Sequence, residues 1–218
     1  MTVIRPIIAA ALAAAALASP AAAAQGDVLI RVRAILVAPN ESAGPVLPTF
    51  PTASVNVGNS VMPEIDFTYM MTNNIGAELI VATTKHSITG NGALAPVGKL
   101  ASTWVLPPTL TLQYHFMPEA KVRPYLGAGI NYSIFYSSNA SDGLEGAIGA
   151  TGVKLKDSFG YAVQAGVDFD ITEKVFLNLD VKYIDMTTKA TLTTGALVNT
   201  VDVKINPIVA GIGIGMRF

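Results

Sequence analysis

The chain has 218 residues, of which 14 are Lys or Arg, 15 are Asp or Glu, and none is Cys. The near balance of charge argues against a nucleic-acid-binding protein, and the lack of cysteine excludes a disulfide framework and a lipid anchor on cysteine. About half of the residues (51%) are apolar, yet no segment after residue 24 is long and apolar enough to span a membrane as a helix. A high apolar content without spanning helices is typical of a membrane β-barrel, because each strand is apolar on one face only.

Residues 1–24 have the parts of a secretory signal peptide. Arg5 precedes a short apolar run at 7–18, and small residues follow at 21–24. The run is shorter than the ~20 apolar residues that a membrane-spanning helix needs. We therefore expect cleavage after Ala24 and a mature chain, residues 25–218, that forms one domain.

Eight segments of the mature chain alternate apolar and polar residues with a period of two, as strands with two different faces do. The segments are residues 28–38, 61–72, 75–85, 104–116, 123–136, 156–170, 175–189 and 205–218. Their connections alternate between long loops and short turns, and in bacterial barrels the short turns face the periplasm. The sequence thus predicts an all-β fold. We expect an eight-stranded antiparallel transmembrane β-barrel with short periplasmic turns, long extracellular loops and both termini on the periplasmic side.

The first segment indicates which face of the strands points into the barrel. Arg31 and Arg33 share one face of it, and two arginines facing lipid would be costly, so this face lines the lumen. The same alternation places nine charged side chains inside, namely Arg31, Arg33, Glu64, Asp66, Glu78, Asp168, Asp180, Lys182 and Arg217. They could form an ion pathway, or pair across a narrow lumen and close it. Their mixed signs favour a plug held by salt bridges.

The first long connection, residues 39–60, is unusually apolar for an extracellular loop, since it contains Val46, Leu47, Phe50 and Val55. An exposed apolar group of this kind can line the mouth of a binding site. It can also pack the loop onto the rim of the barrel, because the side chains of compact loops often form their own cluster. The sequence leaves both interpretations open.

The last segment closes on an aromatic residue. Its apolar face carries Met216 and Phe218, while glycines and Arg217 occupy the other face. A terminal alternating strand of this kind resembles the signal by which bacterial outer-membrane barrels are recognised. We therefore expect Met216 and Phe218 to form the signal that the barrel-assembly machinery reads.

Little in the sequence points to catalysis or to a bound cofactor. His86 and His115 are the only histidines, and two isolated imidazoles without cysteine predict no metal site. An enzyme acting on lipid at the outer rim could use His86, Ser87 and Asp142, but the chain has no nucleophile motif. We expect no catalytic, cofactor-binding or metal-binding residues and no nucleic-acid partner.

Short motifs in a fixed order span most of the mature chain. They are residues 63–72, 74–76, 85–86, 107–110, 113–114, 123–129, 157–160, 164–168, 183–185, 206–207 and 217–218. In order and spacing they resemble the OmpW family of outer-membrane proteins, whose relatives include alkane-uptake porins. Phe159 and Ile208 stand where this family often has Trp, and Asn206 stands where it often has Asp.

The resemblance implies a monomeric barrel in the bacterial outer membrane, surrounded by lipid and lipopolysaccharide. It also implies a narrow apolar channel for passive uptake of small hydrophobic molecules, which leave sideways into the membrane. Phe159 joins Val46, Leu47, Phe50 and Val55 as a candidate for the apolar mouth, although the alternation turns it toward lipid. Two alternatives stay open: a closed structural or stress-response barrel without transport, and, with less support, a lipid-modifying enzyme at the rim.

Overall fold

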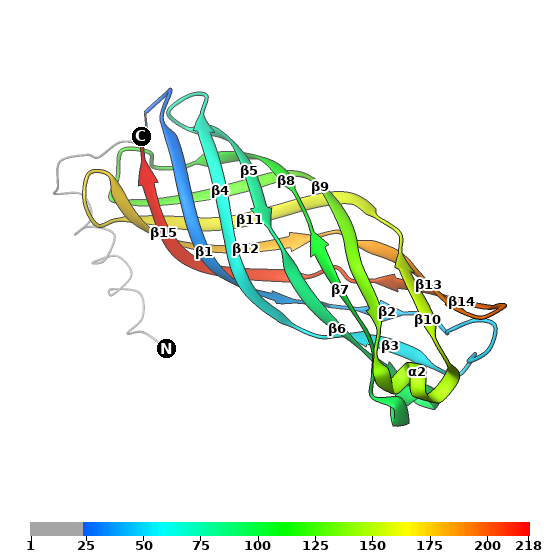
Figure 1. The fold of residues 1–218 in the computed structure, drawn as a ribbon. Coiled ribbons are helices and arrows are strands. Elements are labelled where there is room, and N and C mark those ends of the chain that lie inside the picture. The colour runs from blue at the N-terminus through cyan, green and yellow to red at the C-terminus, as the bar shows by residue number, and fades with distance from the viewer. Residues whose placement is uncertain (1–23) are drawn as a thin grey trace, which may run out of the picture.

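The strands of this protein form one closed barrel that continues at one end into a second, open sheet (Figure 1). The computed structural model describes residues 24–218, so the signal peptide expected at residues 1–24 lies outside the described residues except for Ala24. Among the described residues, no helix is long and apolar enough to cross a membrane.

Eight strands close the barrel, each paired in antiparallel fashion with two neighbours. In order around the barrel they are β1 (Val28–Ala38), β4 (Ser60–Met70), β5 (Ile75–Ala82), β8 (Thr109–His115), β9 (Val122–Ala140), β11 (Ser158–Asp170), β12 (Val175–Ile184) and β15 (Ile208–Arg217). β15 pairs with β1, and this pairing closes the ring. Val28 and Phe218 exchange two backbone hydrogen bonds of 2.9 Å, so both ends of the described chain lie at one end of the barrel. The expected eight-stranded barrel is confirmed.

The other end of the barrel continues as a second sheet, which we call the extension. Its strands, in order, are β3 (Ser54–Val57), β6 (Thr84–Asn91), β7 (Lys99–Leu106), the end of β9, β10 (Thr151–Leu155), β13 (Thr187–Thr194), β14 (Leu197–Lys204) and β2 (Ser42–Ala43). No ladder joins β2 to β3, and residues 44–53 run between them. The 3₁₀ helix η2 (Gly92–Val97) and the helix α2 (Asp142–Ile148) lie near the tip, which is at the lower right in Figure 1.

The long extracellular connections are therefore more regular than the sequence suggested. The ranges 86–103, 137–155 and 190–198 contain most of the extension. In its strands the inward side chains are mostly apolar and the outward ones polar, which is the reverse of the barrel strands. In β13, for example, Thr188 and Ala190 are buried, whereas Lys189 is exposed. A sheet surrounded by water needs its apolar residues inside, whereas a barrel surrounded by lipid needs them outside. A search for outward apolar residues therefore does not find these strands.

The outer surface of the barrel is an apolar belt bounded by aromatic side chains. Leu110, Ile130 and Ile212, which are 51–54% exposed, belong to the belt. At the extension end its boundary is formed by Tyr132, Tyr136, Phe159 and Tyr161, and at the turn end by Tyr69, Tyr114 and Phe116. Aromatic girdles of this kind mark the two membrane interfaces.

Candidate functional site

Charged side chains from adjacent strands and from strands across the lumen meet inside the barrel. Arg31 on β1 lies 2.9 Å from Asp66 on β4 and 3.1 Å from Asp168 on β11. Arg33, two residues along β1, lies 2.9 Å from Glu64 and also contacts Asp66. All five side chains are buried. Because a buried charge is tolerated only when it is paired, these contacts are what holds the group together.

Three further residues complete this group. Lys182 on β12 lies 2.9 Å from Glu64 and 2.7 Å from Asp180. Glu78 on β5 lies 3.4 Å from Arg33. We call these eight residues the charged plug: Arg31, Arg33, Glu64, Asp66, Glu78, Asp168, Asp180 and Lys182. The alternation of the sequence predicted all eight to face the lumen, and the structure brings them together.

Arg217, the ninth predicted lumen charge, lies in a separate layer toward the periplasmic end. It is 3.6 Å from Asp170, which also pairs with Arg123. The guanidinium groups of Arg123 and Arg31 lie 5.4 Å and 5.5 Å from the ring centre of the buried Phe176, so this layer packs against the plug. Arg123 was not predicted as a lumen residue, although its position in β9 gives it the same inward direction as Gly127.

Tyr125 fills the lumen beside the plug. Its hydroxyl donates a hydrogen bond of 2.8 Å to Asp180 and accepts one of 3.1 Å from the amide of Asn178. The ring fits because Gly166 faces it, and a Cβ atom at position 166 would lie 2.3 Å from the ring. The close approach of this ring to the backbone requires glycine at position 166.

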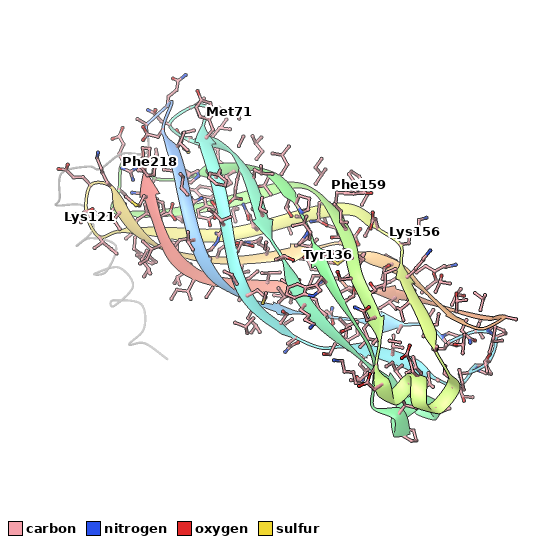
Figure 2. All side chains as sticks on the ribbon, in the orientation of Figure 1. Met71, Lys121, Tyr136, Lys156, Phe159 and Phe218 are labelled. Atoms are coloured by element: carbon pink, nitrogen blue, oxygen red, sulfur yellow. The ribbon has the colours of Figure 1, made fainter. Side chains whose placement is uncertain are left out.

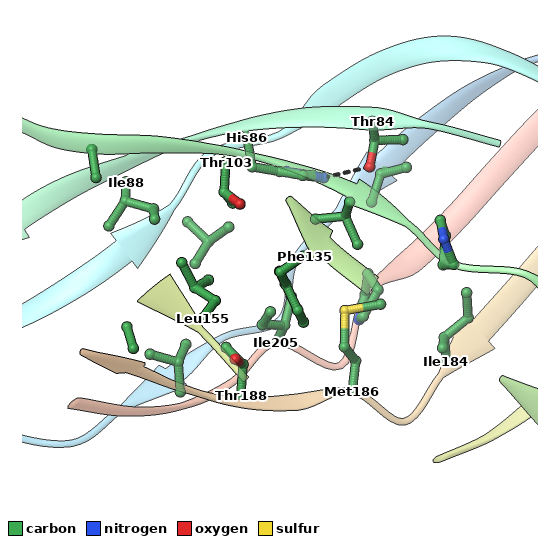
Figure 3. A pocket seen from close by; sticks show the side chains of 18 of the residues that line it. Thr84, His86, Ile88, Thr103, Phe135, Leu155, Ile184, Met186, Thr188 and Ile205 are labelled. Carbon is green, nitrogen blue, oxygen red and sulfur yellow. Dashed lines mark hydrogen bonds between the residues drawn. The ribbon is translucent and has the colours of Figure 1, made fainter. Parts of the chain in front are cut away.

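An apolar cavity of about 80 Å³ lies in the extension (Figure 3). One water-sized sphere needs ~10–15 Å³ on the same scale, so the cavity has room for a small molecule. Of its 28 lining residues 22 are apolar, among them Phe135, Ile184, Met186 and Ile205. Glu64 also lines the cavity, so the charged plug forms its floor.

The polar side chains of the cavity wall are paired within the protein. Thr84 donates to Nε2 of His86 at 3.0 Å, and Nδ1 of His86 donates to the carbonyl of Gly58 at 2.8 Å (Figure 3). Thr188 and Thr109 donate to backbone carbonyls at 2.6 Å and 2.9 Å. Burial lowers the pKa of His86 below its ordinary value of about 6.5, so the ring is neutral at pH 7. These groups therefore leave no free donor for a polar solute.

The residues expected to form an apolar mouth reach the cavity only in part. Val55 lines it, whereas Val46 and Phe50 pack within the apolar cluster of the extension. Leu47 is 46% exposed, and Phe159 is 69% exposed on the outer surface (Figure 2). Leu47 and Phe159 therefore do not line the cavity, and the alternation of β11 turns position 159 toward lipid, as the sequence pattern indicated.

Most of the cavity residues were missed in the sequence. The signal that could have found them is the inverted alternation, as in β14 and the residue that follows it, where Val201, Val203 and Ile205 are buried and Asp202 and Lys204 are exposed. The pattern is clear once an extension beyond the membrane is assumed.

The wall of the barrel is interrupted beside the cavity. The β5–β8 ladder ends with Ile80 opposite Thr109, and the β6–β7 ladder begins with Thr84 opposite Val105. Residues 81–83 and 106–108 therefore have no ladder pairing with each other. Pro107 and Pro108 supply no N–H group for such pairing, and Pro107 lines the cavity.

The closed barrel, with an apolar belt outside and paired charges inside, defines the class of this protein as an outer-membrane β-barrel. The OmpW family model matches residues 24–218, and the chain belongs to the OmpW family. It is 37% identical over 197 residues to outer membrane protein W of Vibrio cholerae, and the aligned region covers 89% of each chain. It is 27% identical over 169 residues to outer membrane protein AlkL of Ectopseudomonas oleovorans, which covers 77% of this chain and 70% of AlkL.

The fold is similar to that of solved outer-membrane proteins. The crystal structure of OprG from Pseudomonas aeruginosa matches with a TM-score of 0.85 and 30% identity, over 91% of this chain and 99% of OprG. The family and these relatives place the protein in the bacterial outer membrane.

Proposed function

We propose that this protein is a channel for the passive uptake of small apolar molecules across the outer leaflet of the outer membrane. Molecules enter the cavity of the extension and leave sideways into the membrane, through the interrupted wall beside Pro107 and Pro108. The proposal rests on one observation: the apolar cavity is bounded on the barrel side by the charged plug, through Glu64.

The plug favours a sideways route over a route to the periplasm. A molecule moving down from the cavity would have to separate ion pairs such as Arg33–Glu64 and Lys182–Glu64, both buried. Separating a buried pair costs several kcal/mol, which an apolar molecule cannot offset. The gap between residues 81–83 and 106–108 requires no such step, because no ladder pairing joins these segments.

The cavity wall favours apolar molecules over polar ones. A hydroxyl or amide buried without a hydrogen-bond partner loses its hydration and gains nothing in return. The wall offers no free hydroxyl donor, since the hydroxyls of Thr84, Thr109 and Thr188 already donate within the protein. We therefore expect hydrocarbons to be admitted in preference to alcohols of the same size.

The alternative of a closed structural barrel is also compatible with a fully paired plug. An enzyme at the rim is less compatible, because His86 is buried and faces the cavity whereas its neighbour Ser87 is exposed on the outside. We therefore do not propose catalysis.

Uptake of a labelled small hydrocarbon, beside a charged solute of similar size, tests the proposal in a host that lacks its own homologue. Ala190→Phe would fill the cavity, and Ala210→Phe is the matched control because Ala210 is exposed on the lipid side. Heat-dependent gel mobility verifies that each variant is folded. Faster hydrocarbon uptake that is lost only in Ala190→Phe supports the channel. Equal uptake with and without the protein refutes it and favours the closed barrel.

We also propose that the last strand is the signal for the barrel-assembly machinery. Met216 and Phe218 are 43% and 64% exposed on the outer surface, so neither side chain fills the lumen. Phe218→Ala should therefore slow assembly in cells while changing the unfolding free energy of the assembled barrel by less than about 1 kcal/mol. Equal assembly rates for the variant and the natural protein would contradict this role.

A further inference from the structure

Four lysines gather on the outer face of the extension. Lys154 belongs to β10 and Lys156 follows it, while Lys189 is on β13 and Lys204 on β14. The backbone N–H of Lys156 donates to the carbonyl of Lys189 at 3.0 Å, so these two residues lie side by side. Their chain neighbours Val153, Leu155, Thr188, Ala190, Val203 and Ile205 line the cavity, so the lysines point away from it. We call the four residues the lysine patch.

The patch keeps a net positive charge, because its four lysines outnumber the nearby carboxylates of Asp157 and Asp202. Within the described part of the chain, its one ion pair joins Lys189 to Asp202 at 3.5 Å, and both side chains are more than half exposed. An exposed pair of this kind contributes little to stability. The nearby carboxylate of Asp157 accepts hydrogen bonds from the Tyr132 hydroxyl and from the backbone N–H of Phe135. Like charges on neighbouring strands repel, so an anion bound across the patch would remove an unfavourable interaction.

The lysine patch lies just above the outer aromatic girdle, and this position favours a lipid as its ligand. Lys156 precedes Phe159, which belongs to the outer aromatic girdle, by only three residues (Figure 2). At about 3.3 Å per residue, three residues of strand span roughly 10 Å. The ammonium groups are thus at the level of lipid headgroups, and Phe159 and Tyr161, both more than half exposed, offer contact for acyl chains directly below.

We propose that the lysine patch binds the phosphorylated sugar headgroup of an outer-leaflet glycolipid of the lipid A type. Several ammonium groups on one face suit phosphates that are separated by a sugar, because lysine contacts phosphate as a point charge that does not demand one geometry. Phe159 and Tyr161 below the patch can contact acyl chains, so the site should prefer an anion that carries acyl chains to a soluble anion. The site is separate from the cavity and does not depend on the proposed transport.

Binding of the folded full-length mature chain to vesicles tests the site. Phosphatidylcholine vesicles with and without 5% lipid A would be compared at about 0.05 M and 0.5 M salt, where screening differs strongly. The variant K154Q/K156Q/K189Q/K204Q should bind lipid A vesicles at least about tenfold more weakly, since each lysine near an anionic surface contributes on the order of fivefold. The matched control is K121Q/K174Q, whose lysines are exposed on the periplasmic turns.

Three outcomes decide the proposal. Loss of lipid A binding in the quadruple variant alone, together with tighter binding by Asp202→Asn, supports it. Equal binding by the quadruple variant and the control overturns it. Displacement of lipid A by millimolar pyrophosphate with no contribution from Phe159→Ala also overturns it, because the site would then be one for soluble phosphate. The substitutions are at exposed positions, and heat-dependent gel mobility verifies folding of each variant.

Discussion

Removal of one charge from the plug tests whether its ion pairs hold the barrel together. Lys182→Met leaves Glu64 and Asp180 with one fewer partner in a site where Lys182 is 2% exposed. Breaking a buried pair by removing one partner costs about 3–5 kcal/mol, because the remaining charge stays buried and uncompensated. We therefore expect a loss of this size in the unfolding free energy.

The chain contains its own control for this experiment. Lys189 pairs with Asp202 at 3.5 Å on the exposed face of the extension, so Lys189→Met should cost less than about 1 kcal/mol. Urea unfolding in lipid vesicles would follow the fluorescence of Trp104, the only tryptophan of the chain. Adding Glu64→Gln to Lys182→Met should restore part of the lost stability. A loss in Lys182→Met within about 1 kcal/mol of that in Lys189→Met would show that the buried ion pairs of Lys182 do not stabilise the barrel.

Two further predictions concern packing and pH. Gly166→Ala places a Cβ atom 2.3 Å from the Tyr125 ring and should lower the unfolding free energy by about 1–3 kcal/mol. The control is Gly146→Ala in α2, whose Cβ atom meets nothing within 4 Å and should leave the unfolding free energy unchanged or slightly higher. Urea unfolding of both variants measures the difference. An equal effect of the two would contradict the close packing. His86 is neutral in the folded protein because burial lowers its pKa, while the unfolded chain binds a proton near pH 6.5. The unfolding free energy should therefore fall as pH drops below about 6.5, and His86→Gln should reduce that slope; identical slopes would show that His86 does not contribute.

The barrel could be predicted from the sequence because lipid and lumen impose opposite demands on alternate residues. The same alternation identified the eight plug residues, since Arg31 and Arg33 define the inward face of β1. Their pairing could not be predicted, because Arg31 and Asp168 are 137 residues apart and meet only when the barrel closes. A register shift of one residue would turn either side chain to the other face.

The extension and its cavity were not predicted, because the alternation of apolar and polar residues reverses where the chain leaves the membrane. The segment expected at 175–189 changes its pattern at Ile184, the last residue of β12. Up to Tyr183 most apolar residues of β12 face lipid, whereas Ile184, Met186 and Ala190 face the cavity. A sequence carries no direct mark of where the membrane ends, so the reversal becomes visible only when the strands are assembled.

Hydrocarbon uptake by Pro107→Ala/Pro108→Ala tests whether molecules leave the cavity sideways through the wall. The alanine at position 107 restores an N–H group toward residues 81–83, whereas position 108 faces β9, where the carbonyl of Pro108 accepts from the N–H of Tyr132. Together the two alanines allow the ladder to close the gap in the wall. Pro207→Ala is the control, because Pro207 also lines the cavity but lies at another joint of the wall. We expect the double variant to fold normally and to lose most hydrocarbon uptake, while Pro207→Ala retains it. Full uptake by a folded Pro107→Ala/Pro108→Ala protein would contradict exit through this part of the wall.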